Sequence, residues 1–283
     1  MILVTGITGQ LGHDVVKELE RRGEDFIGTT RNEIDLTTEE GAKSFILEKK
    51  PEVVIHCAAY TAVDKAEEEA ELALTVNGMG TRRIAEACRE IGAKMLYVST
   101  DYVFGGEGTE PYEIHDEKNP INIYGTSKLL GENSVAAILR DYFIVRISWV
   151  FGANGKNFVK TMLELGKRRR KLQIVDDQIG SPTYTADLAP LLVDMVHSDK
   201  FGIYHATNEG FCSWAEFAEE IFKQVGKKIN IEKIPSADYP TPAKRPLNSR
   251  LSKKSLDDAG FNRLPDWQDA VRRFLIETGS IKK

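Results

Sequence analysis

A tyrosine and a lysine lie four residues apart at Tyr124 and Lys128. On a helix this spacing places both side chains on one face, so a phenol and an ammonium group can point into the same site. A free phenol has a pKa of about 10, and a neighbouring cation favours the phenolate and lowers that pKa. A hydroxyl group from Thr100 or Ser99 could share a hydrogen bond with a substrate oxygen. Together these groups predict acid/base chemistry.

The Tyr-x-x-x-Lys pair does not establish an active site by itself. A chain with nine tyrosines and many lysines contains about one such spacing by chance. The alternative is a tyrosine on a surface helix with a lysine nearby. The elements that surround the pair must therefore support the assignment.

The N-terminal segment supplies a glycine-rich turn between a strand and a helix. Residues 1–5 predict a buried strand, and an amphipathic helix follows up to about Arg22. Gly6 permits a tight turn, Gly9 lets the backbone approach a diphosphate, and Gly12 lets the helix pack on the strand. The helix N-terminus offers amide donors to the anion. We therefore predict a dinucleotide-binding turn, with a purely structural turn as the alternative; its residues are Gly6, Gly9, Gln10, Leu11 and Gly12.

The end of the second predicted strand, residues 25–29, bears on the choice of cofactor. Many NAD-binding proteins carry an acidic residue there, which binds the ribose 2′-hydroxyl. Here the chain continues with Thr30, Arg31 and Asn32, and an arginine can pair with a 2′-phosphate. We therefore favour NADPH over NADH, with a solvated arginine as the alternative. Asp35 and Leu36 are expected near the adenine.

Further strands are predicted at residues 53–59, 94–98 and 143–147. The first is almost continuously apolar, as in strands buried on both faces of a parallel sheet. The alternation of strands and helices predicts an α/β fold with a doubly wound parallel sheet of the Rossmann type. Ligands bind at the carboxyl ends of such strands. The residues expected there are Ala58, Ala59 and Tyr60 at the end of one strand, and Val98, Ser99, Thr100 and Asp101 at the end of another.

The second half of the chain is less regular. Helices are predicted near residues 158–167, 185–197 and 214–225, separated by loops, and the prolines in 238–246 exclude regular helix there. We interpret this half as a smaller, interleaved C-terminal substrate lobe. The predicted division assigns 1–148 with 184–208 to the dinucleotide-binding domain and 149–183 with 209–283 to the substrate-binding lobe.

Composition excludes several other classes. A net charge of −5 and a pI near 5.7 argue against a nucleic-acid surface, and the basic run 167–171 is expected to be a solvated helix end. Cys57, Cys88 and Cys212 lack the spacing of a disulfide framework or a zinc site. His56, within an apolar run, is expected to be a core histidine. No apolar run is long enough to span a membrane, and a reducing cytoplasm is the expected location.

Several longer motifs accompany these features. They are Thr5-Gly6-x-x-Gly9-x-x-Gly12, Ala58-Ala59-Tyr60-Thr61-Ala62-Val63-Asp64-Lys65-Ala66-Glu67, Ser99-Thr100-Asp101-Tyr102-Val103-Phe104, Asn122-Ile123-Tyr124-Gly125, Arg146-x-Ser148-Trp149-Val150, Asn157-Phe158, Asp177-Gln178-x-Gly180-x-Pro182-Thr183 and Arg245-Pro246-x-Asn248-Ser249-Arg250-Leu251. With these motifs the chain resembles, over essentially its whole length, the extended short-chain dehydrogenase/reductase superfamily. Within it the chain resembles the dTDP-4-dehydrorhamnose reductases, which the last three motifs distinguish from other members.

The resemblance implies a role for each matching residue. Tyr124 would be the proton donor, Lys128 would hold the nicotinamide ribose and tune the phenol, and Thr100 would orient the sugar oxygen. Trp149 would lie against the deoxysugar, with core packing as its alternative role. The other residues expected to bind the nucleotide-sugar are Val103, Asn157, Arg245, Asn248 and Arg250.

The implied reaction is the NAD(P)H-dependent reduction of the C4 carbonyl of dTDP-4-dehydro-6-deoxy-L-mannose to dTDP-L-rhamnose. Alternatives are the reduction of another nucleotide 4-keto-sugar, or a non-catalytic role like that of the regulatory subunit of methionine adenosyltransferase. A dehydratase is disfavoured because Tyr102, not a second acid, follows Asp101. Some family members hold Mg²⁺ at a subunit interface. We expect no catalytic metal here, and a homodimer agrees with the resemblance.

Overall fold

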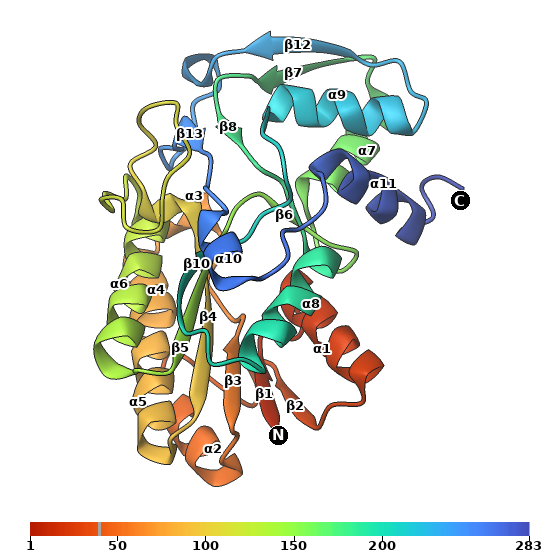
Figure 1. Cartoon of the computed structure of the whole chain (residues 1–283). Helices are drawn as coiled ribbons and strands as arrows, with labels where there is room; N and C mark the ends of the chain where they lie inside the picture. The colour runs from red at the N-terminus through yellow and green to blue at the C-terminus, as the bar shows by residue number, and fades with distance from the viewer. Residues whose placement is uncertain (39–40, 283) are drawn as a thin grey trace.

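The computed structural model describes residues 1–38 and 41–282 and is built around a six-stranded sheet (Figure 1). The strand order is β10-β5-β4-β3-β1-β2, and every pair is parallel. The strands are β1 (Ile2–Thr5), β2 (Phe26–Thr29), β3 (Val53–His56), β4 (Lys94–Thr100), β5 (Tyr142–Ile147) and β10 (Gly202–His205). The order reverses between β1 and β3, which confirms the predicted doubly wound Rossmann fold.

Helices cover both faces of this sheet because its strands are apolar on both faces. Ile2 and Val4 of β1 pack into one hydrophobic cluster, and Leu3 between them packs into the other. The helices α1 (Gln10–Arg22) and α8 (Thr185–Val196) belong to the first cluster, and α2 (Gly41–Lys49), α5 (Thr81–Ile91) and α6 (Ile123–Ile138) belong to the second. The two groups lie on opposite sides of the sheet in Figure 1.

The helix that carries the Tyr-x-x-x-Lys pair, α6, begins directly after a capping asparagine. The side chain of Asn122 accepts a hydrogen bond from the Gly125 backbone, which satisfies a free amide of the first turn of α6. The chain before α6 forms several short helical elements. Short helices α3 (Val63–Ala66) and α4 (Ala70–Leu74) lead into a π-helix, η1 (Thr75–Gly80), and then into α5.

A further hydrophobic cluster lies beyond the carboxyl edge of the sheet and is rich in aromatic side chains, among them Phe151, Phe217 and Phe274. The predicted helices appear there as α7 (Phe158–Arg168) and α9 (Trp214–Gln224). Further elements are β6 (Val150–Phe151), β7 (Lys171–Val175), β8 (Ile179–Gly180), β9 (Thr183–Tyr184), β11 (Cys212–Ser213), β12 (Asn230–Ile234), β13 (Asn248–Ser249) and α11 (Trp267–Glu277). Short turns of 3-10 helix occur at η2 (Asp101–Val103) and η3 (Ser236–Asp238). The parallel pair β7 and β12 joins segments far apart in the sequence.

One C-terminal helix packs on the large sheet, although its sequence lies in the range expected for the smaller lobe. Leu256 of α10 (Lys254–Ala259) is buried in the same cluster as Val145 of β5, and Figure 1 places α10 beside β10. The predicted division assigns this helix to the substrate-binding lobe of 149–183 with 209–283. That division stays a prediction, and its last residue, Lys283, lies outside the described residues.

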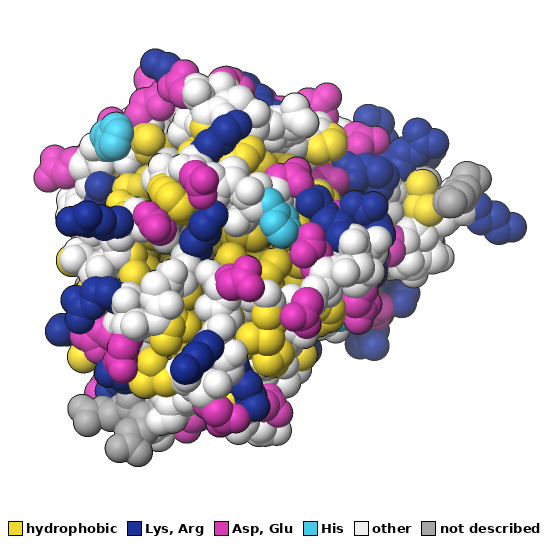
Figure 2. All heavy atoms as spheres, turned by 60° about the horizontal axis from the view of Figure 1, so that its bottom comes forward, with side chains coloured by type: hydrophobic (Ala, Val, Ile, Leu, Met, Phe, Trp, Pro, Cys, Tyr) yellow, Lys and Arg dark blue, Asp and Glu magenta, His cyan; other side chains and the backbone are white. Residues whose placement is uncertain are grey.

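Basic and acidic side chains are interspersed with hydrophobic ones over the face shown in Figure 2. The basic run 167–171 forms the exposed end of α7 and the start of β7, as expected. Within residues 1–38 and 41–282, no helix is both long and apolar enough to cross a membrane.

Candidate functional site

A cavity of about 980 Å³ lies at the carboxyl edge of the parallel sheet. Its lining joins the glycine turn after β1 to the end of β4 and the start of α6. Every residue that we expected to bind the cofactor lines it: Gly6, Gly9, Gln10, Leu11, Gly12, Arg31, Asp35, Leu36, Ala58, Ala59, Tyr60, Val98, Tyr124 and Lys128. The cavity also contains Thr100 and Trp149. The parallel topology therefore brings the expected cofactor-binding residues and the proposed acid/base residues to the same cavity.

The glycine turn has a geometry that side chains would obstruct. Gly6 has a φ of 74°, in the left-handed region, and a Cβ atom there would lie 2.7 Å from the Cα atom of Ala58. Gly9 precedes the first turn of α1 and makes no side-chain cap, and the residues of that turn, Gln10 to Gly12, line the cavity. Such a helix N-terminus suits a diphosphate. The residues therefore fit a dinucleotide cofactor.

Gly12 is the tightest position of this turn, and its replacement is expected to be costly. A Cβ atom at Gly12 would lie 2.4 Å from the carbonyl oxygen of Gly6, whereas one at Gly9 would lie 3.2 Å from the same atom. We expect Gly12→Ala to lower the free energy of unfolding by about 1–3 kcal/mol, because backbone must move. Gly9→Ala should cost less, and urea denaturation of both variants measures the difference. An equal loss in the two would contradict this packing role.

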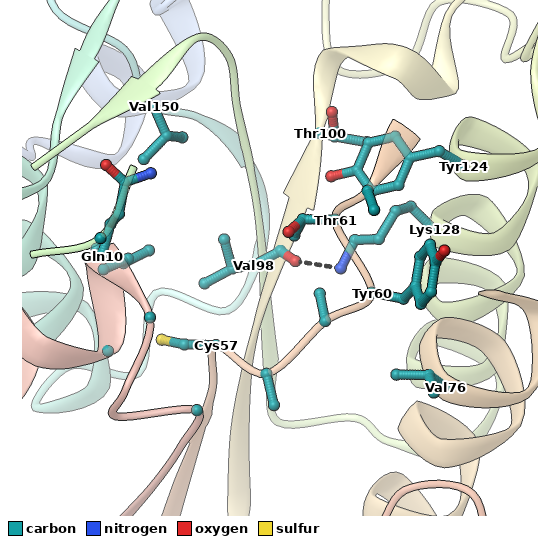
Figure 3. Close-up of a pocket in the computed structure, with 18 of the residues that line it drawn as sticks. Gln10, Cys57, Tyr60, Thr61, Val76, Val98, Thr100, Tyr124, Lys128 and Val150 are labelled. Atoms are coloured by element: carbon teal, nitrogen blue, oxygen red, sulfur yellow. Dashed lines mark hydrogen bonds between the residues drawn. The ribbon is translucent and has the colours of Figure 1, made fainter. Parts of the chain in front are cut away.

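Tyr124, Lys128 and Thr100 converge on one side of the cavity (Figure 3). Tyr124 and Lys128 project from the first two turns of α6, and Thr100 ends β4. The Lys128 side chain is 2 % exposed, and its Nζ atom donates to the carbonyl oxygen of Val98 at 2.8 Å. The same atom lies 4.1 Å from the centre of the Tyr97 ring. The lysine is thus held in place by a carbonyl group and an aromatic face.

Burial decides the electrostatics of this group. It lowers the pKa of Lys128 to about 7, against the opposing charge of Glu132. It also raises the pKa of Tyr124 above its usual range, although a hydrogen bond with Thr100 acts in the other direction. The lowering of the phenol pKa by Lys128 that we expected is therefore not what this structure shows. The desolvation of the phenol outweighs the influence of its polar neighbours, and the phenol is a protonated donor at neutral pH.

Aromatic side chains form the opposite wall of the cavity. Trp149 stacks on Trp214, with ring centres 3.7 Å apart, and both residues line the cavity with Phe158. Trp149 has a φ of 48°, which a residue of this size rarely adopts. Gly180 leaves room for it, since a Cβ atom there would lie 2.9 Å from the indole ring. The fold thus holds this indole ring at the cavity in a strained backbone conformation.

Five residues that we expected to bind the nucleotide-sugar do not line this cavity. Val103 is fully buried against Phe104 and Leu251. Asn157 caps α7, and its amide group donates to Gln10 at 2.9 Å. The side chains of these two residues contribute to packing and loop geometry, and their contact with the nucleotide-sugar stays a prediction.

The remaining three residues lie in the segment around β13. Arg245 forms a bidentate ion pair with Asp64, with nitrogen-to-oxygen distances of 2.6 and 2.8 Å. Asn248 donates to the carbonyl oxygens of Glu107 and Glu110 and accepts from Arg250. The ion pair connects the C-terminal segment to α3, and the bonds of Asn248 connect it to the loop after η2. Arg245 and Arg250 are partly exposed, whereas Asn248 is buried.

Two supporting groups were not predicted from the sequence. The first is Asn77, in the π-helix, which bonds the backbone of Tyr60 in both directions and donates to Ser127 of α6 at 2.9 Å. It joins a cavity loop to the helix of the acid/base pair. The glycines on either side of Met79 were the sequence signal of an irregular helix in this segment. Such π-helical turns often occur at functional sites.

The second supporting group is a buried ion pair one turn beyond Lys128. Glu132 accepts from Arg146 through two hydrogen bonds of 2.7 and 2.8 Å, and from Ser99 at 2.6 Å. The arginine is fully buried and the glutamate is 3 % exposed. The pair fastens α6 to β4 and β5. Charged residues in an apolar strand, such as Arg146, were the available sequence signal.

Other titratable residues are structural, as expected. His56 is buried between the hydroxyl groups of Thr5 and Thr81, and burial lowers its pKa to about 3. This confirms a core histidine. All three cysteines are free. Across residues 1–38 and 41–282, no group of three or more His, Cys, Asp or Glu residues is placed to hold a metal ion.

The parallel sheet, the glycine turn and the Tyr-x-x-x-Lys pair at one cavity define a dinucleotide-binding oxidoreductase of the extended short-chain dehydrogenase/reductase class. The family model described as the RmlD substrate binding domain matches residues 1–279. The chain belongs to this family.

Individual relatives are similar to this protein over nearly the whole chain. The chain is 39% identical over 279 residues to the spore coat polysaccharide biosynthesis protein SpsK of Bacillus subtilis, covering 99% of this chain and 98% of that protein. It is 41% identical to the dTDP-4-dehydrorhamnose reductase of Streptomyces griseus, covering 95% and 91%. A crystal structure of the dTDP-4-dehydrorhamnose reductase of Bacillus anthracis in complex with NADP has a TM-score of 0.95 at 42% identity, covering 98% and 99%.

Proposed function

We propose that the protein uses NADPH or NADH to reduce the C4 carbonyl of dTDP-4-dehydro-6-deoxy-L-mannose, giving dTDP-L-rhamnose in the last step of its biosynthesis. The observation that carries this proposal is the position of Tyr124, Lys128 and Thr100 in the cavity that the glycine turn also lines. The family and the names of its reductase members support the choice of sugar.

The residues of the chain have distinct tasks in this reaction. A reduced nicotinamide bound in the cavity supplies the hydride. Tyr124 donates its proton to the C4 oxygen as negative charge develops there, and Thr100 stabilises the same oxygen by a hydrogen bond. Lys128, fixed by the Val98 carbonyl group, holds the nicotinamide ribose. Its charge also favours the phenolate that remains after proton transfer.

The aromatic wall provides the surface for the sugar. Trp149 presents an indole face on which the apolar side of a deoxysugar can pack, and Trp214 supports it from behind. Arg245 and Arg250 are proposed to bind the nucleotide diphosphate, since a guanidinium group matches its oxygens in pairs. For Arg245 this requires an exchange of the Asp64 carboxylate for the diphosphate.

The direct test mixes the purified protein with freshly prepared dTDP-4-dehydrorhamnose and follows the oxidation of NADPH. The same assay is run in parallel with NADH. Oxidation that depends on this sugar is the expected result, and the two rates rank the cofactors. Cofactor binding without oxidation would instead favour another nucleotide 4-keto-sugar or a regulatory role like that of the methionine adenosyltransferase subunit.

Arg31 is expected to set the preference for NADPH. It lines the cavity after β2 and is exposed, whereas the neighbouring acid Glu33 bonds the backbone and hydroxyl group of Thr30 at 2.7 and 2.6 Å. Arg31→Ala should raise KM for NADPH about tenfold, since one charge-assisted contact to the 2′-phosphate is lost, and change KM for NADH little. Arg31→Lys, which keeps the charge, is the control. An equal rise for both cofactors would refute this assignment.

The wider setting of the protein is part of the same proposal. We infer a nucleotide-sugar as its substrate, no nucleic-acid or membrane partner, a homodimer as its assembly and the cytoplasm as its location. The net charge of −5 argues against a nucleic-acid partner, and the free cysteines fit a reducing compartment. A structural Mg²⁺ at a subunit interface would bind between chains, and sedimentation with and without EDTA tests both the dimer and the ion.

A further inference from the structure

Asp101 is a buried carboxylic acid at the site for which the reaction above has no task. It follows Thr100 at the end of β4, lines the cavity and is 3 % exposed. Its Oδ1 atom accepts a hydrogen bond from Thr100 Oγ1 at 3.0 Å. Its Oδ2 atom is buried and, among the described residues, has no hydrogen-bond partner, although the Ser249 hydroxyl group faces the carboxyl group. A carboxylate with an unpaired buried oxygen is costly, and a proton on that oxygen removes the cost.

The hydroxyl group of Thr100 has one proton and two lone pairs to share. One lone pair accepts from the backbone amide of Tyr102 at 3.2 Å. An ionised Asp101 can only accept, so it holds the Thr100 proton and withholds it from a substrate oxygen. A protonated Asp101 can donate to the second lone pair of Thr100, whose own proton then becomes available.

We propose that Asp101 is a positioning residue that acts in its protonated form, donating to Thr100 Oγ1 and so directing the Thr100 hydroxyl group toward the carbonyl oxygen that is reduced. This inference rests on the proposed function, because it takes Thr100 as a donor to that oxygen. The proton stays on the carboxyl group of Asp101 throughout the reaction. Only the orientation of two hydrogen bonds changes.

The surroundings of Asp101 favour this neutral form. Burial raises its pKa to about 6, against the opposing influence of the Ser249 and Thr100 hydroxyl groups and the local backbone. After burial, the groups that act most strongly on the carboxyl group are neighbouring hydroxyl and backbone groups. The titratable groups that face it are Tyr102 on its own segment and Tyr124 on α6, and beyond Tyr102 lies Arg245, paired with Asp64.

The pH dependence of kcat tests the proposal. In the wild type, kcat should fall as the pH rises from about 6 to about 8, because Asp101 loses its proton and Thr100 turns toward it. Asp101→Asn keeps an N–H donor at every pH, so only the fall that Lys128 contributes, with its pKa of about 7, should persist. The ratio of kcat at pH 6 to kcat at pH 8 should therefore be about tenfold larger in the wild type.

Two outcomes of this kinetic test would overturn the proposal. One is an equal ratio in the two proteins. The other is a loss of kcat of about 10²-fold or more in Asp101→Asn at every pH, which would mean that the carboxylate is required. Asp258→Asn, a change of an exposed acid on α10, serves as the matched control and should leave the profile unchanged.

Infrared spectroscopy detects the proton on the Asp101 carboxyl group directly, and it requires no sugar substrate. The difference spectrum between wild type and Asp101→Asn should contain the C=O band of a protonated carboxyl group at pH of about 5.5, and this band should disappear with a midpoint at about 6 or above. Absence of the band at the lower pH would overturn the proposal. A wild type that fails to reduce the sugar but shows the band would count against the proposed function alone.

Discussion

Tyr124→Phe is expected to lower kcat by about 10²- to 10⁴-fold, because phenylalanine has no proton to give to the developing alkoxide. Burial keeps the phenol of Tyr124 protonated at neutral pH, so the native side chain has a proton to donate. The ring itself is retained in the variant, and the edge-to-face contact with Tyr102 at 5.6 Å should persist. Single-turnover oxidation of NADPH measures the chemical step directly.

The controls for this prediction separate chemistry from binding. The dissociation constant of NADPH, measured by fluorescence, should stay within about twofold, since the hydroxyl group is expected to contact the sugar oxygen and not the diphosphate. Tyr142→Phe makes the same change at the start of β5, away from the cavity, and should leave turnover unaffected. If Tyr124→Phe turned over at the wild-type rate, Tyr124 would not be the proton donor.

Arg146→Met is expected to lower the free energy of unfolding by about 3–5 kcal/mol. The variant leaves the buried carboxylate of Glu132 with only the Ser99 hydroxyl group as a partner. An unpaired charge at such a depth costs more than the ion pair itself contributes. Denaturation in urea, followed by circular dichroism, measures the loss.

Removal of both charges distinguishes this explanation from a simple loss of packing. The double variant Arg146→Met with Glu132→Leu should recover most of the stability, because no unpaired charge remains. Arg140→Met changes an exposed arginine just after the same helix and should shift the stability by less than about 0.5 kcal/mol. Failure of the double variant to recover would indicate that the arginine acts through its volume and its bond to the Ile114 carbonyl group.

These two predictions concern neighbouring parts of one helix. Tyr124 and Lys128 occupy the first turns of α6, and Glu132 follows one turn later. The buried ion pair fixes this helix to the sheet, while Asn77 fixes it to the loop of Tyr60. The acid/base pair therefore projects from a helix that is anchored at several points, as preorganised chemistry requires.

The sequence alone determined five strands of the parallel sheet and the expected cofactor-binding residues that line the cavity. Short apolar runs and glycine spacing act over a few positions, so they can be recognised locally. Once the strands are parallel and singly connected by helices, their carboxyl ends must meet at one edge. For this reason residues as far apart as Gly6 and Lys128 can be assigned to one site from their positions along the chain.

Only the tertiary structure decided the contacts between distant segments. The stacking of Trp214 on Trp149, the pairing of Glu132 with Arg146 and the packing of α10 on the large sheet join residues that no local pattern relates. Burial is also a property of the whole fold, and it raised the pKa of Tyr124 where spacing alone suggested a lowered value. The spacing of residues along a helix determines which side chains can lie close together. The desolvation that sets their pKa depends on every element packed around them.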